Sequence, residues 1–76
     1  MVPLDANQIR QFADLGTAIS KRRRALRMTQ EQLASLSGIA QPNLSNIERG
    51  LADGRLDTYL KICSLIGIDL FAVPRA

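Results

Sequence analysis

The chain has 76 residues, of which 46% are hydrophobic, and this composition favours one domain with a packed core over a disordered chain. With no histidine and only Cys63 as a thiol, an internal disulfide is excluded, an enzyme or a metal site has little support, and no cofactor is expected. Nothing resembles a signal peptide or a membrane span, so the sequence predicts a cytoplasmic protein. Ten basic residues against seven acidic ones give a net charge of +3, which suits a polyanionic partner.

The first predicted element is an amphipathic helix that ends near Arg27. Asp5 and Asn7 are its two candidate N-caps. Apolar positions then recur at spacings of three and four, at Ile9, Phe12, Leu15 or Gly16, Ile19, Arg23 and Leu26. Arg23 falls on this apolar face, so its charge requires a buried or half-buried anion.

A basic cluster occupies the second half of this helix. It consists of Lys21, Arg22, Arg23, Arg24 and Arg27. Such a cluster attracts phosphate, but a solvated helix face explains it equally well.

Two short helices follow. Thr29 and Gln32 have the spacing of a capping box, and Gly38 can take the positive φ that ends a helix. A third helix opens near Gln41, with Pro42 tolerated in its first turn, and ends at Gly50. The apolar residues that we expect to face inward from these two helices are Leu33, Leu36, Leu44 and Ile47.

A fourth helix is predicted over 55–66. Its expected inward residues are Leu56, Leu60, Cys63 and Ile66, and Gly67 terminates it. The remaining tail, 68–76, is apolar and partly alternating over 68–73, which predicts one β-strand.

A single strand needs a ladder partner, and the rest of the chain is predicted to be helical. The strand therefore predicts a homodimer in which residues 68–73 of two copies pair antiparallel about a two-fold axis. Its interface would contain Ile68, Leu70, Phe71 and Val73. The alternative is a frayed extension that packs on its own subunit.

Residues 30–49 have the pattern of a helix-turn-helix. Ala34 is small where the two helices must approach closely, and Gly38 supplies the turn. The polar residues left on the second helix are Gln41, Asn43, Ser45 and Asn46. Such side chains can hydrogen-bond to base edges and phosphates in a major groove.

The order and spacing of these pieces resemble the lambda-repressor/Cro-like (Xre) helix-turn-helix family between Gly16 and Gly67. The matching pieces are residues 19–23, 28–34, 38–39, 44–50 and 56–60. The resemblance implies an all-α, compact domain of four to five helices over 1–76, closed by the short C-terminal strand. Pro42 and Arg55 depart from the residues usual at their positions.

The resemblance also implies roles for particular residues. The implied base contacts are Gln41, Pro42, Ser45 and Asn46, and the implied phosphate contacts are Gln30, Asn43, Arg22 and Arg49. Arg23 and Glu48 would form a partly buried ion pair.

The implied function is a sequence-specific, double-stranded DNA-binding transcriptional regulator, a nucleoid-associated repressor that binds a palindromic operator as a dimer. Residues 65–74 are similar to the ends of HipB-like antitoxins, which implies an autoregulated operon and a HipA-like kinase toxin as partner. The alternative is a stand-alone Xre-type phage or metabolic regulator without a toxin.

Overall fold

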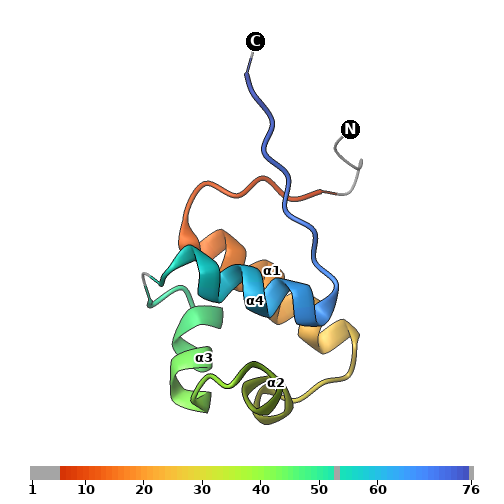
Figure 1. Ribbon diagram of the computed structural model, residues 1–76, viewed down its shortest axis with the longest axis vertical. Coiled ribbons are helices and arrows are strands. Elements are labelled where there is room, and N and C mark those ends of the chain that lie inside the picture. The colour runs from red at the N-terminus through yellow and green to blue at the C-terminus, as the bar shows by residue number, and fades with distance from the viewer. Residues whose placement is uncertain (1–5, 53, 76) are drawn as a thin grey trace.

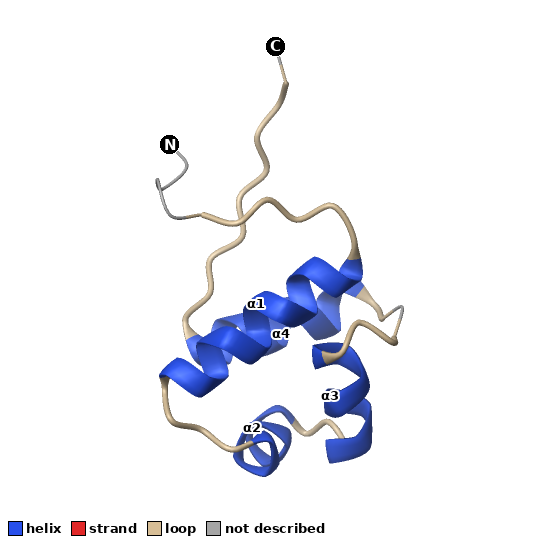
Figure 2. Ribbon diagram, turned by 180° about the vertical axis from the view of Figure 1, so that it is seen from behind, coloured by secondary structure: helices blue, strands red, loops and turns tan. Residues whose placement is uncertain are grey.

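The computed structural model describes residues 6–52 and 54–75, and these form four helices, which confirms the predicted all-α class (Figure 1). They are α1 (Phe12–Ala25), α2 (Gln30–Ser37), α3 (Gln41–Glu48) and α4 (Leu56–Ile66). The helices α1 and α4 pack on each other, with α2 and α3 on one side of this pair (Figures 1 and 2). None of the helices in the described ranges is long and apolar enough to cross a membrane.

The core draws apolar side chains from all four helices. Its buried members are Leu15, Ile19, Leu33, Ala34, Leu44, Ile47, Tyr59, Ile62, Cys63 and Ile66. Tyr59 stacks on Phe12 with ring centroids 4.9 Å apart, and its hydroxyl donates to the carbonyl of Ala52 at 3.1 Å. The ring therefore joins α4 to the start of α1 and to the loop after α3.

Both predicted ends of α2 and the predicted start of α3 are confirmed, whereas α3 ends at Glu48, before the predicted Gly50. The Thr29 hydroxyl accepts from the Gln32 backbone N–H at 3.0 Å, and the Gln32 side chain accepts from the Thr29 N–H at 2.7 Å. Gly38 ends α2 with φ of 73°, and Pro42 lies in the first turn of α3. These signals are local in the sequence, which is why they could be identified before the fold was known.

The predicted start of the first helix is wrong. Asn7 precedes α1, which begins only at Phe12, and Asp5 lies outside the described residues. Asp14 supplies the physical reason, because its carboxylate accepts from the backbone N–H groups of Arg10 at 2.9 Å and Gln11 at 3.2 Å. These bonds satisfy donors that a longer helix would have taken up itself.

Several leucines predicted to be buried are exposed. The exposed fractions are 42% for Leu26, 58% for Leu36, 59% for Leu56 and 46% for Leu60. In α4, Cys63 and Ile66 are buried as predicted, but Tyr59 and Ile62 complete the buried face in place of the two leucines. This helix is apolar on more than one face, so periodicity alone did not identify its inner face.

The predicted C-terminal strand is absent from the described tail, residues 68–75. The Ile68 N–H donates to the Cys63 carbonyl at 2.9 Å, and the side chain packs partly on the core. Beyond it, Leu70, Phe71 and Val73 are exposed. A strand needs a ladder partner, and the described part of this single chain provides none.

Candidate nucleic-acid interface

The polar face of α3 is turned away from the core. Leu44 and Ile47 are buried beneath it, whereas Gln41, Asn43 and Asn46 are exposed and Ser45 is half-buried. Pro42 and Arg49 are also exposed, at the start and just past the end of α3. The helices α2 and α3 lie at the end of the molecule opposite the tail, so this face is accessible to a large partner (Figure 1).

The position of α3 depends on a close approach to α1 at Gly16. A Cβ atom at Gly16 would overlap the carbonyl oxygen of Ile47 and lie 3.2 Å from its carbonyl carbon. Only glycine allows the two backbones to approach this closely. The site where α3 rests on α1 is therefore fixed by the absence of a side chain.

Arg23 and Glu48 form a bidentate ion pair between α1 and the last residue of α3. Arg23 Nε lies 2.8 Å from Glu48 Oε2, and Arg23 Nη2 lies 2.9 Å from Glu48 Oε1. Arg23 Nη1 also donates to the carbonyl of Met28 at 2.8 Å. The two side chains are only 9% and 3% exposed. This pair provides the anion that an arginine on an apolar face requires.

The Glu48 carboxylate is held in its ionised form. Burial opposes ionisation, but hydrogen bonds from Arg23, Gln30 and Ser20 and the charge of Arg23 outweigh it. The pKa of Glu48 is therefore lower than its usual value of 4.5. An ionised carboxylate accepts hydrogen bonds and donates none.

The hydrogen bonds continue from this pair to the surface. Gln30 Nε2 donates to Glu48 Oε1 at 3.3 Å, and Gln41 Nε2 donates to Gln30 Oε1 at 2.8 Å. A residue predicted to contact phosphate is thus joined to one predicted to read bases. Both lie at helix N-termini, where backbone N–H groups favour anions.

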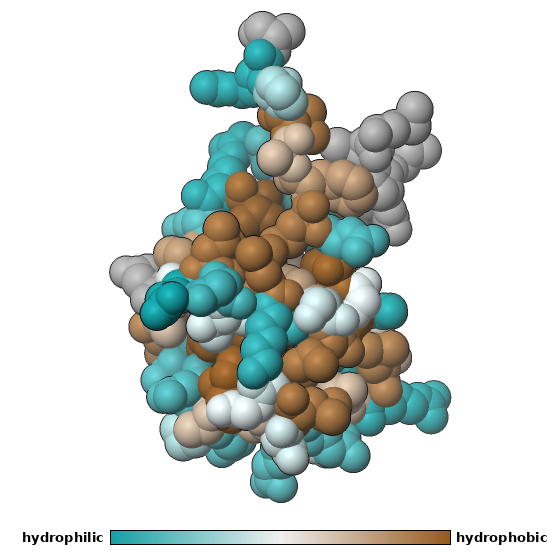
Figure 3. Space-filling model, in the orientation of Figure 1, coloured by the Kyte–Doolittle hydropathy of each residue, from teal (hydrophilic) through white to brown (hydrophobic). Residues whose placement is uncertain are grey.

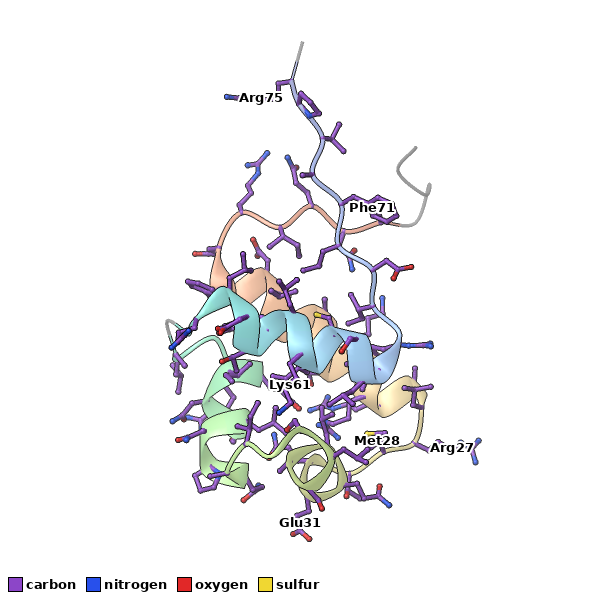
Figure 4. The ribbon with its side chains drawn as sticks, viewed as in Figure 1. Arg27, Met28, Glu31, Lys61, Phe71 and Arg75 are labelled. Atoms are coloured by element: carbon purple, nitrogen blue, oxygen red, sulfur yellow. The ribbon has the colours of Figure 1, made fainter. Side chains whose placement is uncertain are left out.

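Of the basic cluster, Arg23 lies beside Gln30, because both donate to Glu48 Oε1. Arg22 Nε donates to the carbonyl of Ile66 at 2.8 Å, at the C-terminus of α4 where a cation is favourable. A phosphate contact by Arg22 would compete with this bond. Lys21 and Arg24 are exposed on α1, and Arg27 points outward in the turn after it, with φ of 55° (Figure 4).

Two elements of this site escaped the sequence reasoning. The role of Gly16 in bringing α1 against α3 has no local signal beyond a glycine within a helix. The contact of Gln30 with Glu48 joins residues 18 positions apart, so only the fold brings them together.

Within the described ranges, no group of His, Cys, Asp and Glu side chains could hold a metal ion, and Cys63 is buried in the core.

The sequence matches a helix-turn-helix family model over residues 19–73. It is 40% identical over 52 residues to an HTH-type transcriptional regulator of Haemophilus influenzae, a match that covers 68% of this chain and 53% of that protein. The chain therefore spans about half the length of this curated relative.

The fold is similar to three solved structures of related size. A HipB–O4 20mer complex and a HipA–HipB–O2–O3 complex each match with a TM-score of 0.79 and 25% identity, over 93% of this chain and 100% of theirs. The restriction-modification controller protein C.AhdI of Aeromonas hydrophila matches with a TM-score of 0.69 and 29% identity, over 76% of this chain and 84% of its own.

Proposed function

Because the chain belongs to the helix-turn-helix family of transcriptional regulators, which is not a class of enzymes, we propose that it represses transcription by binding a specific DNA duplex. The observation that carries this proposal is the hydrogen bond between the side-chain amides of Gln41 and Gln30. These residues begin α3 and α2, beside the exposed polar face of α3. Its side chains match the hydrogen-bonding groups of a major groove.

The proposed base contacts come from the first two turns of α3. They are Gln41, Pro42, Ser45 and Asn46. Gln30, Asn43 and Arg49 are proposed to bind phosphates, which would fix the register of α3 in the groove without reading sequence.

Selection from random duplexes is expected to enrich one motif, because exposed α3 side chains would discriminate base edges. The affinity for that motif should fall with salt, since Arg49, the basic residue among the proposed phosphate contacts, displaces counterions from phosphate. Binding measured at several salt concentrations checks the second expectation. Recovery of no motif at all would refute the repressor proposal.

A homodimer on a palindromic operator is the second part of the proposal. Figure 3 shows apolar surface gathered over α4 and the adjoining tail, where Leu65, Leu70 and Phe71 are exposed. A second copy would cover this surface and bury its apolar side chains. It would also place two α3 helices one turn of DNA apart, or a multiple of it.

Deleting residues 68–76 is expected to convert the dimer to a monomer, because the deletion removes Leu70, Phe71 and Val73 from the exposed apolar surface. Sedimentation in solution measures the change. Leu70→Ser with Phe71→Ser should give the same result in a full-length chain, whereas Arg75→Ser on the same tail should leave the dimer intact. A truncated chain that stays dimeric and binds its operator unchanged would contradict the proposal.

An antitoxin role is supported by the similarity to HipB, which one solved structure contains together with HipA. We propose that this chain pairs in the same way with a kinase-type toxin and represses the operon that encodes both. A kinase-like reading frame beside its gene would support this role. A gene without such a neighbour would favour the stand-alone regulator.

A further inference from the structure

Four side chains form one continuous row of hydrogen bonds from the core to the DNA-facing surface. The row begins at Arg23, passes through Glu48 and Gln30, and ends at Gln41. Its inner half is buried and its outer end is exposed. The row therefore links a charged group in the core to the residue proposed to read a base.

The chemistry of the inner pair fixes the direction of every bond in this row. Arginine only donates and an ionised carboxylate only accepts, so Gln30 must turn its Nε2 toward Glu48. Its Oε1 then faces Gln41, which must donate in turn. If the side-chain amide of Gln30 or Gln41 were reversed, two acceptors or two donors would face each other, and the hydrogen bond between them would be lost.

We propose that Glu48 is a positioning residue that sets, through Gln30, the order of donor and acceptor that Gln41 presents to DNA. This inference rests on the proposed function. One Nε2 hydrogen of Gln41 is used by Gln30, so one N–H and the Oε1 are left for a base edge.

That remaining pair matches adenine and not guanine. Adenine offers one acceptor, N7, and one donor, the N6 amino group, whereas guanine offers two acceptors, N7 and O6. A glutamine free of Gln30 could turn both of its N–H bonds toward guanine. The row of hydrogen bonds therefore accounts for discrimination between the two purines, which a phosphate contact by Gln30 alone would not provide.

The row can be cut without disturbing the ion pair. Gln30 is the first residue of α2 and is half-buried, and both bonds between Arg23 and Glu48 are independent of it. Gln30→Leu removes both amide contacts and retains the size of the side chain. Glu48→Gln removes the acceptor-only group and the ion pair with it, so Gln30→Leu is the variant that cuts the row alone. Gln8→Leu is a matched control at an exposed glutamine outside the row.

The test first locates the base pair whose preference is lost in Gln41→Ala, by duplex selection. Binding is then measured to two duplexes that carry adenine or guanine at that position. The wild-type chain is expected to prefer adenine about ten- to a hundredfold, the range of a good bidentate contact. Gln30→Leu and Glu48→Gln should reduce this ratio several-fold, and Gln8→Leu should leave it unchanged.

Equal weakening of both duplexes by Gln30→Leu, with the ratio intact, would overturn the inference while leaving the proposed function in place. A wild-type preference for a base other than adenine at that position would overturn it as well. A wild-type chain that selects no motif would refute the proposed function and the inference together. Circular dichroism spectra of each variant establish that the compared proteins are folded.

Discussion

Arg23→Ala and Glu48→Ala are each expected to lower the free energy of unfolding by about 3–5 kcal/mol, because each leaves a buried charge without its partner. A loss of that size is a large part of the whole stability of a small domain. Urea unfolding measures the loss. The exposed pair of Arg55 and Asp57, with side chains 84% and 66% exposed and 3.0 Å apart, is the matched control. Arg55→Ala should cost no more than about 1 kcal/mol.

The double variant of Arg23 and Glu48 should be less destabilised than the sum of the two single variants, since neither charge is then left alone. Additive losses would show that the two residues do not interact.

The dependence of the free energy of unfolding on pH is a second test of the ion pair between Arg23 and Glu48. The folded pKa of Glu48 is lowered, so its contribution is fully present above the unfolded pKa, near the usual 4.5, and is lost as pH falls through the folded pKa. Glu48→Gln should lack this component.

Local signals predicted both ends of α2 but missed the start of α1, where Asp14 accepts from the backbone of Arg10 and Gln11. Thr29, Gln32 and Gly38 act on backbone groups within a few residues, so their roles follow from spacing alone. Leu56 and Leu60 are apolar residues in an apolar helix, and only the packing of Tyr59 and Ile62 decides which face is inside.

In the candidate site, too, some contacts could be predicted from the sequence and others could not. An arginine on an apolar face predicted a buried anion, and the family resemblance supplied Glu48 as its partner. The bond from Gln30 to Glu48 has no signal in the sequence, because a half-buried glutamine at a helix start serves many purposes. The tail was predicted wrongly from its alternating pattern, because a strand also needs a ladder partner, and the described part of this chain provides none.

Gly16→Ala is expected to destabilise the fold by about 3 kcal/mol, at the upper end of what overpacking a core costs. The sign is informative, because the same change inside a helix ordinarily stabilises it by about 1 kcal/mol. Here the added Cβ would meet the backbone carbonyl of Ile47, which cannot move aside as a flexible side chain could.

A shift of α3 away from α1 would relieve the overlap at Gly16→Ala, and that shift would move the residues proposed to contact DNA. Affinity for the selected duplex should therefore fall even at a temperature where circular dichroism shows the variant to be folded. Thr17→Ala is the matched control, since Thr17 is the exposed neighbour on α1 and its hydroxyl donates to the Ala13 carbonyl at 3.0 Å. If Gly16→Ala raised the melting temperature and left binding intact, the close approach of α1 and α3 would not be what holds α3 in place.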